Sequence, residues 1–274
     1  MLEKLTFEVK ETPVLYDFNG EIITSNTHKA IVKAETGKQL STMKNSYNTM
    51  HTSDFMESVE RMSEISGFNK AGYSELDEGR IILAHLKNNG ENFEIGGHKI
   101  EDYLVMGSSF DGRYSFFIGT STVLLRCSNQ FSKLSRMEKV RHTKSAPKRR
   151  EELMSGLEVY FEERRDMYRN FEKMREVKVD PEILRMAQDY VLSIDKHDRL
   201  DGKLSTRKQN QLNLLHNDMI LEMNDLGENV WALMNGVTKY TTHTMKQKER
   251  TFGNLFGNSA NINKRAYEFA TSLI

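Results

Sequence analysis

The 274-residue sequence predicts an α+β fold, in which a mixed, mainly antiparallel sheet in the N-terminal half packs against a helical C-terminal half with one long helix. Short β-rich runs separated by glycine turns fill most of the first half, and apolar residues recur at helical spacing through the second. A hydrophobic share of 38% beside a charged share of 28% is typical of a folded chain. We expect a β-rich half, 1–132, and a helical half, 133–274, within one continuous structural unit.

The first elements are a hairpin and a helix. Residues 28–35 and 38–51 are β-rich runs on either side of a glycine turn, which is typical of a β-hairpin. Apolar residues recur at helical spacing over 55–66, and Gly67 follows where a helix would end. We therefore expect a helix between the first hairpin and the next strands.

The strand signal returns after residue 73. A buried strand is expected over 81–84, and a polar, glycine-bearing loop over 88–98. Two further strands, 101–109 and 114–128, flank an Asp-Gly turn, which is a strong hairpin signal.

The second half is helical. We expect helices over 146–177, 181–194, 205–223 and 262–273, and another that begins at 227 or 228 and holds Trp231. Loops are expected over 195–203 and 251–261.

Several kinds of chemistry are disfavoured. Cys127 is the only cysteine, so no internal disulfide can form, and a lone cysteine is more often a packed core residue than a nucleophile. The eight histidines lack metal-ligand spacing, and no glycine-rich phosphate-binding loop is present. We expect no cofactor and no metal. The N-terminal residues lack the pattern of a secretory signal and no apolar run is long enough to span a membrane, which favours the cytoplasm.

Basic residues concentrate in two stretches although the formal net charge is zero. Residues 133–150, expected to form a loop and a helix start, carry eight Lys and Arg against one Glu. Residues 239–274 carry six against two and interleave them with aromatic residues. Cations that neutralise phosphates beside aromatic rings that stack on bases are typical of single-stranded nucleic-acid binding. Acidic protein partners could also use such patches.

We accordingly predict a nucleic-acid-binding set. The residues expected to contact phosphates or to border the basic stretches are Arg126, Arg136, Arg141, His142, Lys144, Lys148, Arg149, Arg150, His243, Lys246, Lys248, Arg250 and Lys264. The residues expected to stack on bases are Tyr240, Phe252 and Phe256.

Three separated blocks resemble a known family. The run SSFDGRYSFFIGTSTVLLRCSNQF (108–131), with RHT at 141–143, resembles the family's NSHDGS…R-V-V-C-x-N-T-L signature. WALMNGVTKYTTH (231–243), then Arg250, FGN (256–258) and NKRAYEFA (263–270), resemble its W-x-x-x-N-x-x-T-x-Y-x-x-H, arginine, glycine loop and K-x-R-A ending. Upstream, AIVKAETGKQLSTMKNSYNTM is similar to its R-x-D-T-G-x-x-L-x-x-V-x-x-x-Y strand pair.

The family is the phage/plasmid-like protein family, a domain of unknown function in bacteriophage and plasmid genomes. The resemblance covers residues 28–270, with Phe110 in place of a histidine and Gln130-Phe131 in place of Thr-Leu. It implies a phage or mobile-element origin, in the cytoplasm of an infected or plasmid-bearing cell, and an association with replication and recombination.

Taken together, these expectations favour a protein of DNA metabolism that binds single-stranded DNA without catalysis, with strand annealing and homo-oligomerisation as extensions. One alternative is a phage interaction protein that inhibits or redirects a host factor through the expected long helix. The other is an enzyme acting on nucleic acid or nucleotides, for which Asp111, Cys127, His142 and His243 are the available polar candidates.

Overall fold

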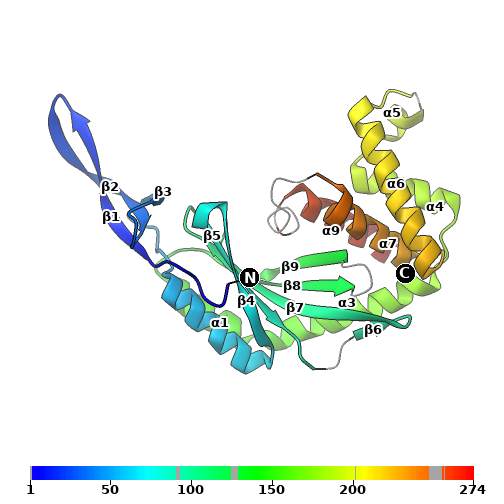
Figure 1. Cartoon of the computed structure of the whole chain (residues 1–274), viewed down its shortest axis with the longest axis horizontal. Helices are drawn as coiled ribbons and strands as arrows, with labels where there is room; N and C mark the ends of the chain where they lie inside the picture. Colours follow the sequence, from blue (N-terminus) through cyan, green and yellow to red (C-terminus); the bar gives the residue numbers. More distant parts are fainter. Residues whose placement is uncertain (1, 91–92, 125–128, 201, 247–254, 256) are drawn as a thin grey trace. The chain divides into compact units, whose positions relative to one another are not determined.

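The computed structural model, which describes residues 2–90, 93–124, 129–200, 202–246, 255 and 257–274, confirms an α+β fold (Figure 1). Antiparallel sheets lie in the N-terminal half, and most helices lie in the C-terminal half. The chain divides into two compact units. Unit 1 comprises Met1–Glu91, Tyr103–Thr120 and Leu134–Tyr160, and unit 2 comprises Asn92–Asp102, Ser121–Lys133 and Phe161–Ile274.

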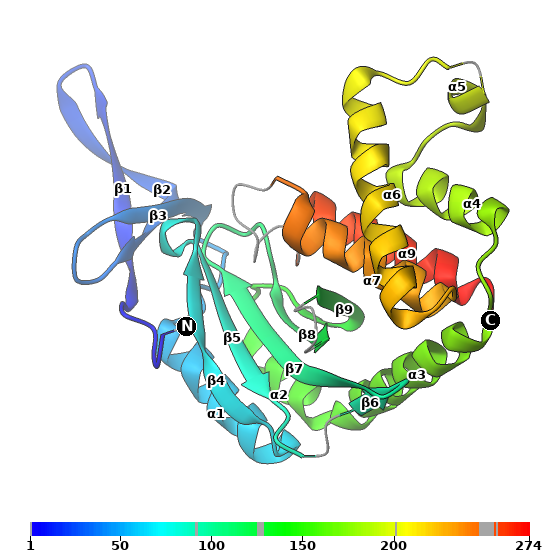
Figure 2. The same ribbon diagram turned by 45° about the vertical axis from the view of Figure 1, so that its right-hand side comes forward.

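A long hairpin begins unit 1. Strands β1 (Val9–Phe18) and β2 (Glu21–Lys33) pair antiparallel around Asn19 and Gly20 (Figure 2). The φ angles of these two residues are 56° and 85°, as a two-residue hairpin turn requires. Strand β3 (Gln39–Lys44) pairs with the base of β2, which confirms the hairpin predicted from residues 28–51. The β1–β2 hairpin itself was not predicted, although Asn-Gly between apolar runs is a strong signal for one.

The second sheet has the order β4-β5-β7-β8-β9, with β6 paired to β7. Its strands are β4 (Asn69–Leu76), β5 (Ile81–Lys87), β6 (Phe93–Ile95), β7 (His98–Ser109), β8 (Phe116–Leu124) and β9 (Asn129–Val140). A 3₁₀ turn, Asp77–Gly79, joins β4 to β5. The expected polar loop over 88–98 thus contains the short strand β6, and the Asp-Gly turn joins β7 to β8 as predicted.

The basic stretch 133–150 begins as a strand, so the prediction of a loop is wrong as far as Val140. Strand β9 stands at the end of the strand order, where it pairs with β8. Pairing with a neighbouring strand satisfies the backbone of a polar segment, and lysines on an edge strand discourage pairing with further chains. The stretch as far as Val140 is therefore part of the sheet.

Helix α1 (Thr52–Ser66) confirms the predicted helix and packs on the second sheet. The ring of Phe55 lies 6.4 Å from the rings of both Tyr73 and Phe116, measured between centroids. Gly67 ends the helix with a φ of 70°. The amides of Thr52 and Ser53 at the first turn donate to the carboxylate of Glu8, which ties the segment before β1 to this helix.

The remaining helices are α2 (Ala146–Ser155), α3 (Leu157–Glu176), α4 (Pro181–Leu192), α5 (Lys196–Leu200), α6 (Thr206–Leu226), α7 (Val230–Lys239) and α9 (Asn258–Thr271), with a π-helical turn at Tyr240–Thr244. The side chain of Ser205 caps α6 as predicted, and α7 holds Trp231. Helix α5 occupies part of the expected loop 195–203.

The single long helix predicted over 146–177 is wrong, because Gly156 separates α2 from α3. Its amide lies 3.2 Å from the carbonyl of Glu152 and 3.1 Å from that of Leu153, and its ψ is 22° instead of a helical value. Glycine has a low helix propensity, so the heptad-like stripe on either side does not carry the helix through this residue.

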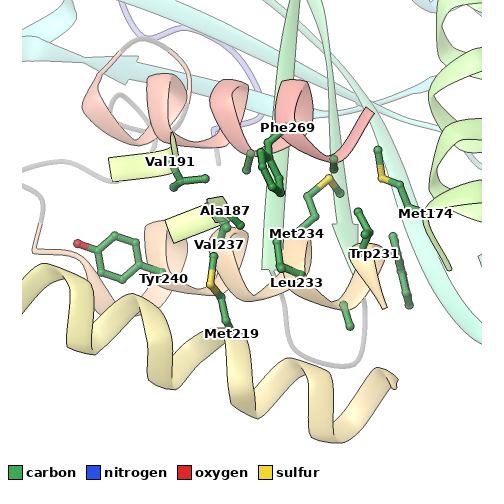
Figure 3. Close-up of a cluster of buried hydrophobic side chains, with 14 of the residues drawn as sticks. Met174, Ala187, Val191, Met219, Trp231, Leu233, Met234, Val237, Tyr240 and Phe269 are labelled. Carbon is green, nitrogen blue, oxygen red and sulfur yellow. The ribbon is translucent and has the colours of Figure 1, made fainter. Parts of the chain in front are cut away.

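A helical core stabilises unit 2. Its buried residues come from α3, α4, α6, α7, the π-helical turn and α9, and ten of them are labelled in Figure 3. Ile95 and Ile100 from β6 and β7 complete the core. Trp231 is 2% exposed in this core. Helices α6 and α7 approach closely because position 236 is glycine: a Cβ there would collide with the backbone of Met219. No described helix is both long and apolar enough to cross a membrane.

One buried ion pair joins α3 to β7 within unit 2. The Nε of Arg164 lies 2.5 Å from a carboxylate oxygen of Asp102, and the two side chains are 11% and 2% exposed. The guanidinium also lies over the rings of Phe93 and Tyr168, 5.0 and 5.9 Å from their centroids. These two rings stack on each other at 3.6 Å, so the cation is held by both charge and aromatic contacts.

Candidate functional site

Residues from the separated family-like blocks meet in unit 1. Tyr47 follows β3, Ser108 and Ser109 end β7, and His142 follows β9. We call this group, with Tyr114, the Tyr47–His142 cluster. Nearly one hundred positions separate the first and last members of the cluster in the sequence, so the sequence does not reveal their contact. The antiparallel pairing of β7, β8 and β9 brings the chain after β9 back to the residues that end β7.

Aromatic and backbone contacts fix the cluster. The Tyr47 ring and the His142 imidazole pack with centroids 4.9 Å apart and planes inclined at 37°. The Tyr47 hydroxyl donates to the carbonyl of Ser109 at 2.9 Å, and the amide of Asn48 donates to the carbonyl of His142 at 3.2 Å. Burial, followed by the nearby Asp111 carboxylate, raises the pKa of Tyr47, so this hydroxyl keeps its proton. The cluster therefore holds the segment after β9 against the segment after β3.

His142 is poorly suited to act as a general base toward Ser108. Its Nε2 lies 3.2 Å from the carbonyl oxygen of Tyr114 and 3.4 Å from Oγ of Ser108. A carbonyl oxygen can only accept, so the shorter contact requires the proton on Nε2, which then has no lone pair for the serine hydroxyl. Burial lowers the pKa of His142, so the ring is neutral near pH 7. Its contacts are those of an anchoring residue.

The Asp-Gly turn is also structural. The Arg113 guanidinium binds Asp111 with an Nε–Oδ2 distance of 2.5 Å and forms a second ion pair with Asp77. Phe110, where the resembled family has a histidine, is completely buried and packs edge-on against Phe7 at 5.9 Å. The contacts of Asp111 and Phe110 are therefore those of residues that hold the turn in place.

The anchored segment presents four exposed cations. Arg141, Lys144, Lys148 and Arg149 are exposed, and we call them, with the backbone between them, the 141–149 cationic segment. His142 is the partly buried residue beneath it, and the amide of Ala146 bonds back to the carbonyl of Thr143 where α2 begins. The positive end of the α2 dipole adds to the charge of this surface. Only Lys148 has a described carboxylate partner, Glu152 at 3.7 Å.

Two members of the predicted set need correction in unit 1. Arg150 is only 8% exposed, beside the charges of Asp54 and Glu151, so it is not available to a phosphate. His142 is partly buried, and burial lowers its pKa, so the neutral ring positions its neighbours instead of neutralising phosphates. Arg136 lies on β9, and Arg126 and Cys127 lie outside the described residues.

In unit 2 the family-like W-x-x-x-N-x-x-T-x-Y-x-x-H block is largely internal. Tyr240 is 1% exposed among the core side chains that Figure 3 labels, so the prediction that it stacks on bases is wrong. Asn235 Nδ2 donates to the carbonyl of Trp231 at 2.9 Å, and Thr238 Oγ1 donates to that of Asn235. Thr241, in the π-helical turn, donates to the side chain of Asn263 from the last block.

Of the predicted basic and aromatic residues in unit 2, His243, Lys246 and Lys264 are exposed. Lys264 lies 3.7 Å from Glu268 on α9. Lys248, Arg250, Phe252 and Phe256 lie outside the described residues.

A buried charged group in unit 2 was missed. Asp218 and Glu222, 6% and 2% exposed, lie one turn apart on α6, and Lys239 on α7 binds Glu222 at 3.0 Å. Burial raises the pKa of Asp218 despite a hydrogen bond from Thr244. The signal was present in the sequence, because both carboxylates interrupt the apolar face of α6 at helical spacing. Among the described residues, no group of three or more His, Cys, Asp or Glu could hold a metal ion.

A family model described as a domain of unknown function (DUF932) matches residues 39–266. The match begins after the β1–β2 hairpin and ends within α9, so it includes both the Tyr47–His142 cluster and the helical core. No curated protein and no solved structure matches the chain.

Proposed function

The chain belongs to the family described as a domain of unknown function (DUF932), and we propose that it binds single-stranded DNA, without catalysis, through the 141–149 cationic segment. The observation that carries the proposal is that these four cations lie on a segment held by a partly buried anchor, the packing of the His142 ring against the Tyr47 ring. Cations on a protein segment that is held in place bind a polyanion with less loss of conformational freedom than cations on a mobile segment.

Charge separation supports the same surface. No acidic residue stands between Lys139 and Arg150, whereas α3 alternates acidic and basic residues and pairs several of them along the helix. A mixed surface binds phosphates weakly because its carboxylates repel them. A phage or plasmid origin and a role in strand annealing form part of this proposal, and both rest on the resemblance of the sequence blocks.

The test is a salt titration of binding to a fluorescent single-stranded oligonucleotide, followed by anisotropy. The triple variant Arg141→Gln, Lys144→Gln, Arg149→Gln should bind more weakly and lose about 2 units from the slope of log K against log salt, since each single-strand phosphate contact contributes about 0.7. The matched control Lys4→Gln, Lys10→Gln, Lys44→Gln removes the same charge from exposed positions in unit 1.

Equal losses in the two triple variants would show that net charge, not the segment, governs binding. Absence of binding by the unsubstituted protein at low salt would refute the proposal. Competition with a duplex of the same sequence distinguishes a single-strand preference from general affinity for polyanions.

His142→Phe tests the anchor separately. Phenylalanine keeps a ring against Tyr47 but cannot make the contact at the Tyr114 carbonyl. Under the proposal this variant retains most of its affinity, because the imidazole carries no charge in the interface. Complete loss of binding by a folded His142→Phe protein would favour a direct or catalytic role for the imidazole instead.

A further inference from the structure

Helix α6 has an unusual outward face. Asn210, Leu214, Asn217, Leu221 and Asn224 follow one another at steps of four and three residues, and all are exposed. Leu214 and Leu221 are 45% and 51% exposed. Steps of four and three place side chains in one stripe along a helix, and over Asn210–Asn224 this stripe is about 21 Å long at 1.5 Å per residue.

The opposite face of α6 already has its partners. Leu212, Leu215, Met219 and Met223 are buried in the core of unit 2, where α6 packs against α7. The outward stripe is therefore additional to what the fold needs. Its amide and leucine side chains differ from the exposed Glu, Asp and Arg residues of α3, which are typical of a solvated helix face.

We propose that this stripe pairs two copies of the chain through antiparallel α6 helices. In that direction the stripe is complementary to itself, because leucines and amides alternate in the same order from either end. A two-fold axis near Asn217 places Leu214 opposite Leu221 of the second copy, and Asn210 opposite Asn224 of the second copy. Asn217 meets its own counterpart, and an amide can donate and accept at once, so the two side chains satisfy each other.

Charge selects the same direction. Exposed Arg207 stands beyond Leu214 at the N-terminal end of α6, and exposed Glu228 stands just past its C-terminal end. Antiparallel pairing brings Arg207 of one copy toward Glu228 of the other, twice for each dimer. Parallel pairing would instead bring like charges together, which is unfavourable.

The contact is a single helix pair, smaller than the roughly 800 Å² per partner of a standard interface. The dimer is therefore expected to be reversible and to depend on concentration. It uses no residue of the 141–149 cationic segment, so the two proposals rest on different residues. Its test requires no nucleic acid, and failure of either proposal leaves the other intact.

Sedimentation velocity of the full chain over a range of protein concentrations provides the test. We expect a monomer–dimer equilibrium, and at least a tenfold weaker association for Leu214→Gln, Leu221→Gln. Ile65→Gln is the matched control, because Ile65 is an exposed aliphatic residue, 49% exposed, on the helix α1 of unit 1. Fluorescence of Trp231 reports whether each variant keeps the core of unit 2.

Charge reversal gives a second, independent readout. Arg207→Glu should weaken association, and Arg207→Glu combined with Glu228→Arg should restore it, because the pair is exchanged between copies. A protein that stays monomeric at every concentration would overturn the proposal. So would a dimer that is unchanged in the double leucine variant, or one that Ile65→Gln disrupts equally.

Discussion

Replacing Arg164 with methionine should strongly destabilise unit 2. The substitution keeps much of the apolar volume over Phe93 and Tyr168 but removes the Arg164 cation from the Asp102 carboxylate, whose side chain is 2% exposed. Removing one member of a buried ion pair typically costs about 3–5 kcal/mol, because the remaining charge stays desolvated. That is a large fraction of the roughly 5–15 kcal/mol that stabilises an ordinary protein.

The assay follows from the position of Trp231, the one tryptophan in the sequence, which is buried in the core of unit 2. Urea denaturation followed by its fluorescence therefore reports on unit 2. Arg165→Met is the control: Arg165 is the next residue on α3 and is exposed, so its loss should change the free energy of unfolding by less than about 0.5 kcal/mol.

A double-mutant cycle completes the experiment. Asp102→Leu together with Arg164→Met removes both charges, so its cost should be smaller than the sum of the two single substitutions, with a coupling of about 1–3 kcal/mol. If Arg164→Met and Arg165→Met lower the free energy of unfolding equally, the buried ion pair does not stabilise unit 2.

Three further predictions concern the backbone and one carboxylate. Partial burial would raise the pKa of Glu8, but hydrogen bonds from Thr52 and neighbouring amides outweigh it and lower this pKa to about 2. Glu8→Gln should therefore lower the free energy of unfolding by about 1 kcal/mol at pH 7, after allowance for solvent screening, and should not change it below pH 2. The stabilisation by Glu8 is present above the ordinary carboxyl pKa and is lost as the pH falls toward 2, and thermal melts across pH 2–7 measure it. Gly156→Ala meets only ordinary contacts and should leave stability unchanged or raise it by up to about 1 kcal/mol in urea titrations. Gly236→Ala forces α7 away from the backbone of Met219 and should lower the free energy of unfolding by about 1–3 kcal/mol in the same urea titration. An unchanged free energy would contradict the close packing of α6 and α7.

Local signals predicted most of the elements. Apolar spacing and Gly67 placed α1, Ser205 placed the start of α6, and the Asp-Gly turn placed the connection between β7 and β8. These features act within a few residues along the chain, so they can be read without knowing what the segment packs against. The Asn19–Gly20 hairpin carries a signal of the same kind, so its turn also follows from local sequence.

Two of the errors occurred where tertiary contacts decide, and one has a local cause. A polar run became β9 because β8 supplies hydrogen bonds at the sheet edge. The predicted long helix is instead divided at Gly156, because glycine has a low helix propensity. Tyr240 carried the same aromatic chemistry as an exposed base-stacking residue, yet helix packing buries it. Composition identifies an aromatic or basic residue but does not state which side of a helix faces solvent.

The sequence alone determined the α+β class, most element positions, the lack of internal disulfides and the concentration of cations near residue 141. Only the tertiary structure decided which cations are exposed, that His142 is a neutral anchor on Tyr47, and that Arg164 is a buried partner of Asp102. The physical reason is that charge and local propensity belong to a residue and its near neighbours. Burial, protonation and pairing depend on groups that folding brings from distant parts of the chain.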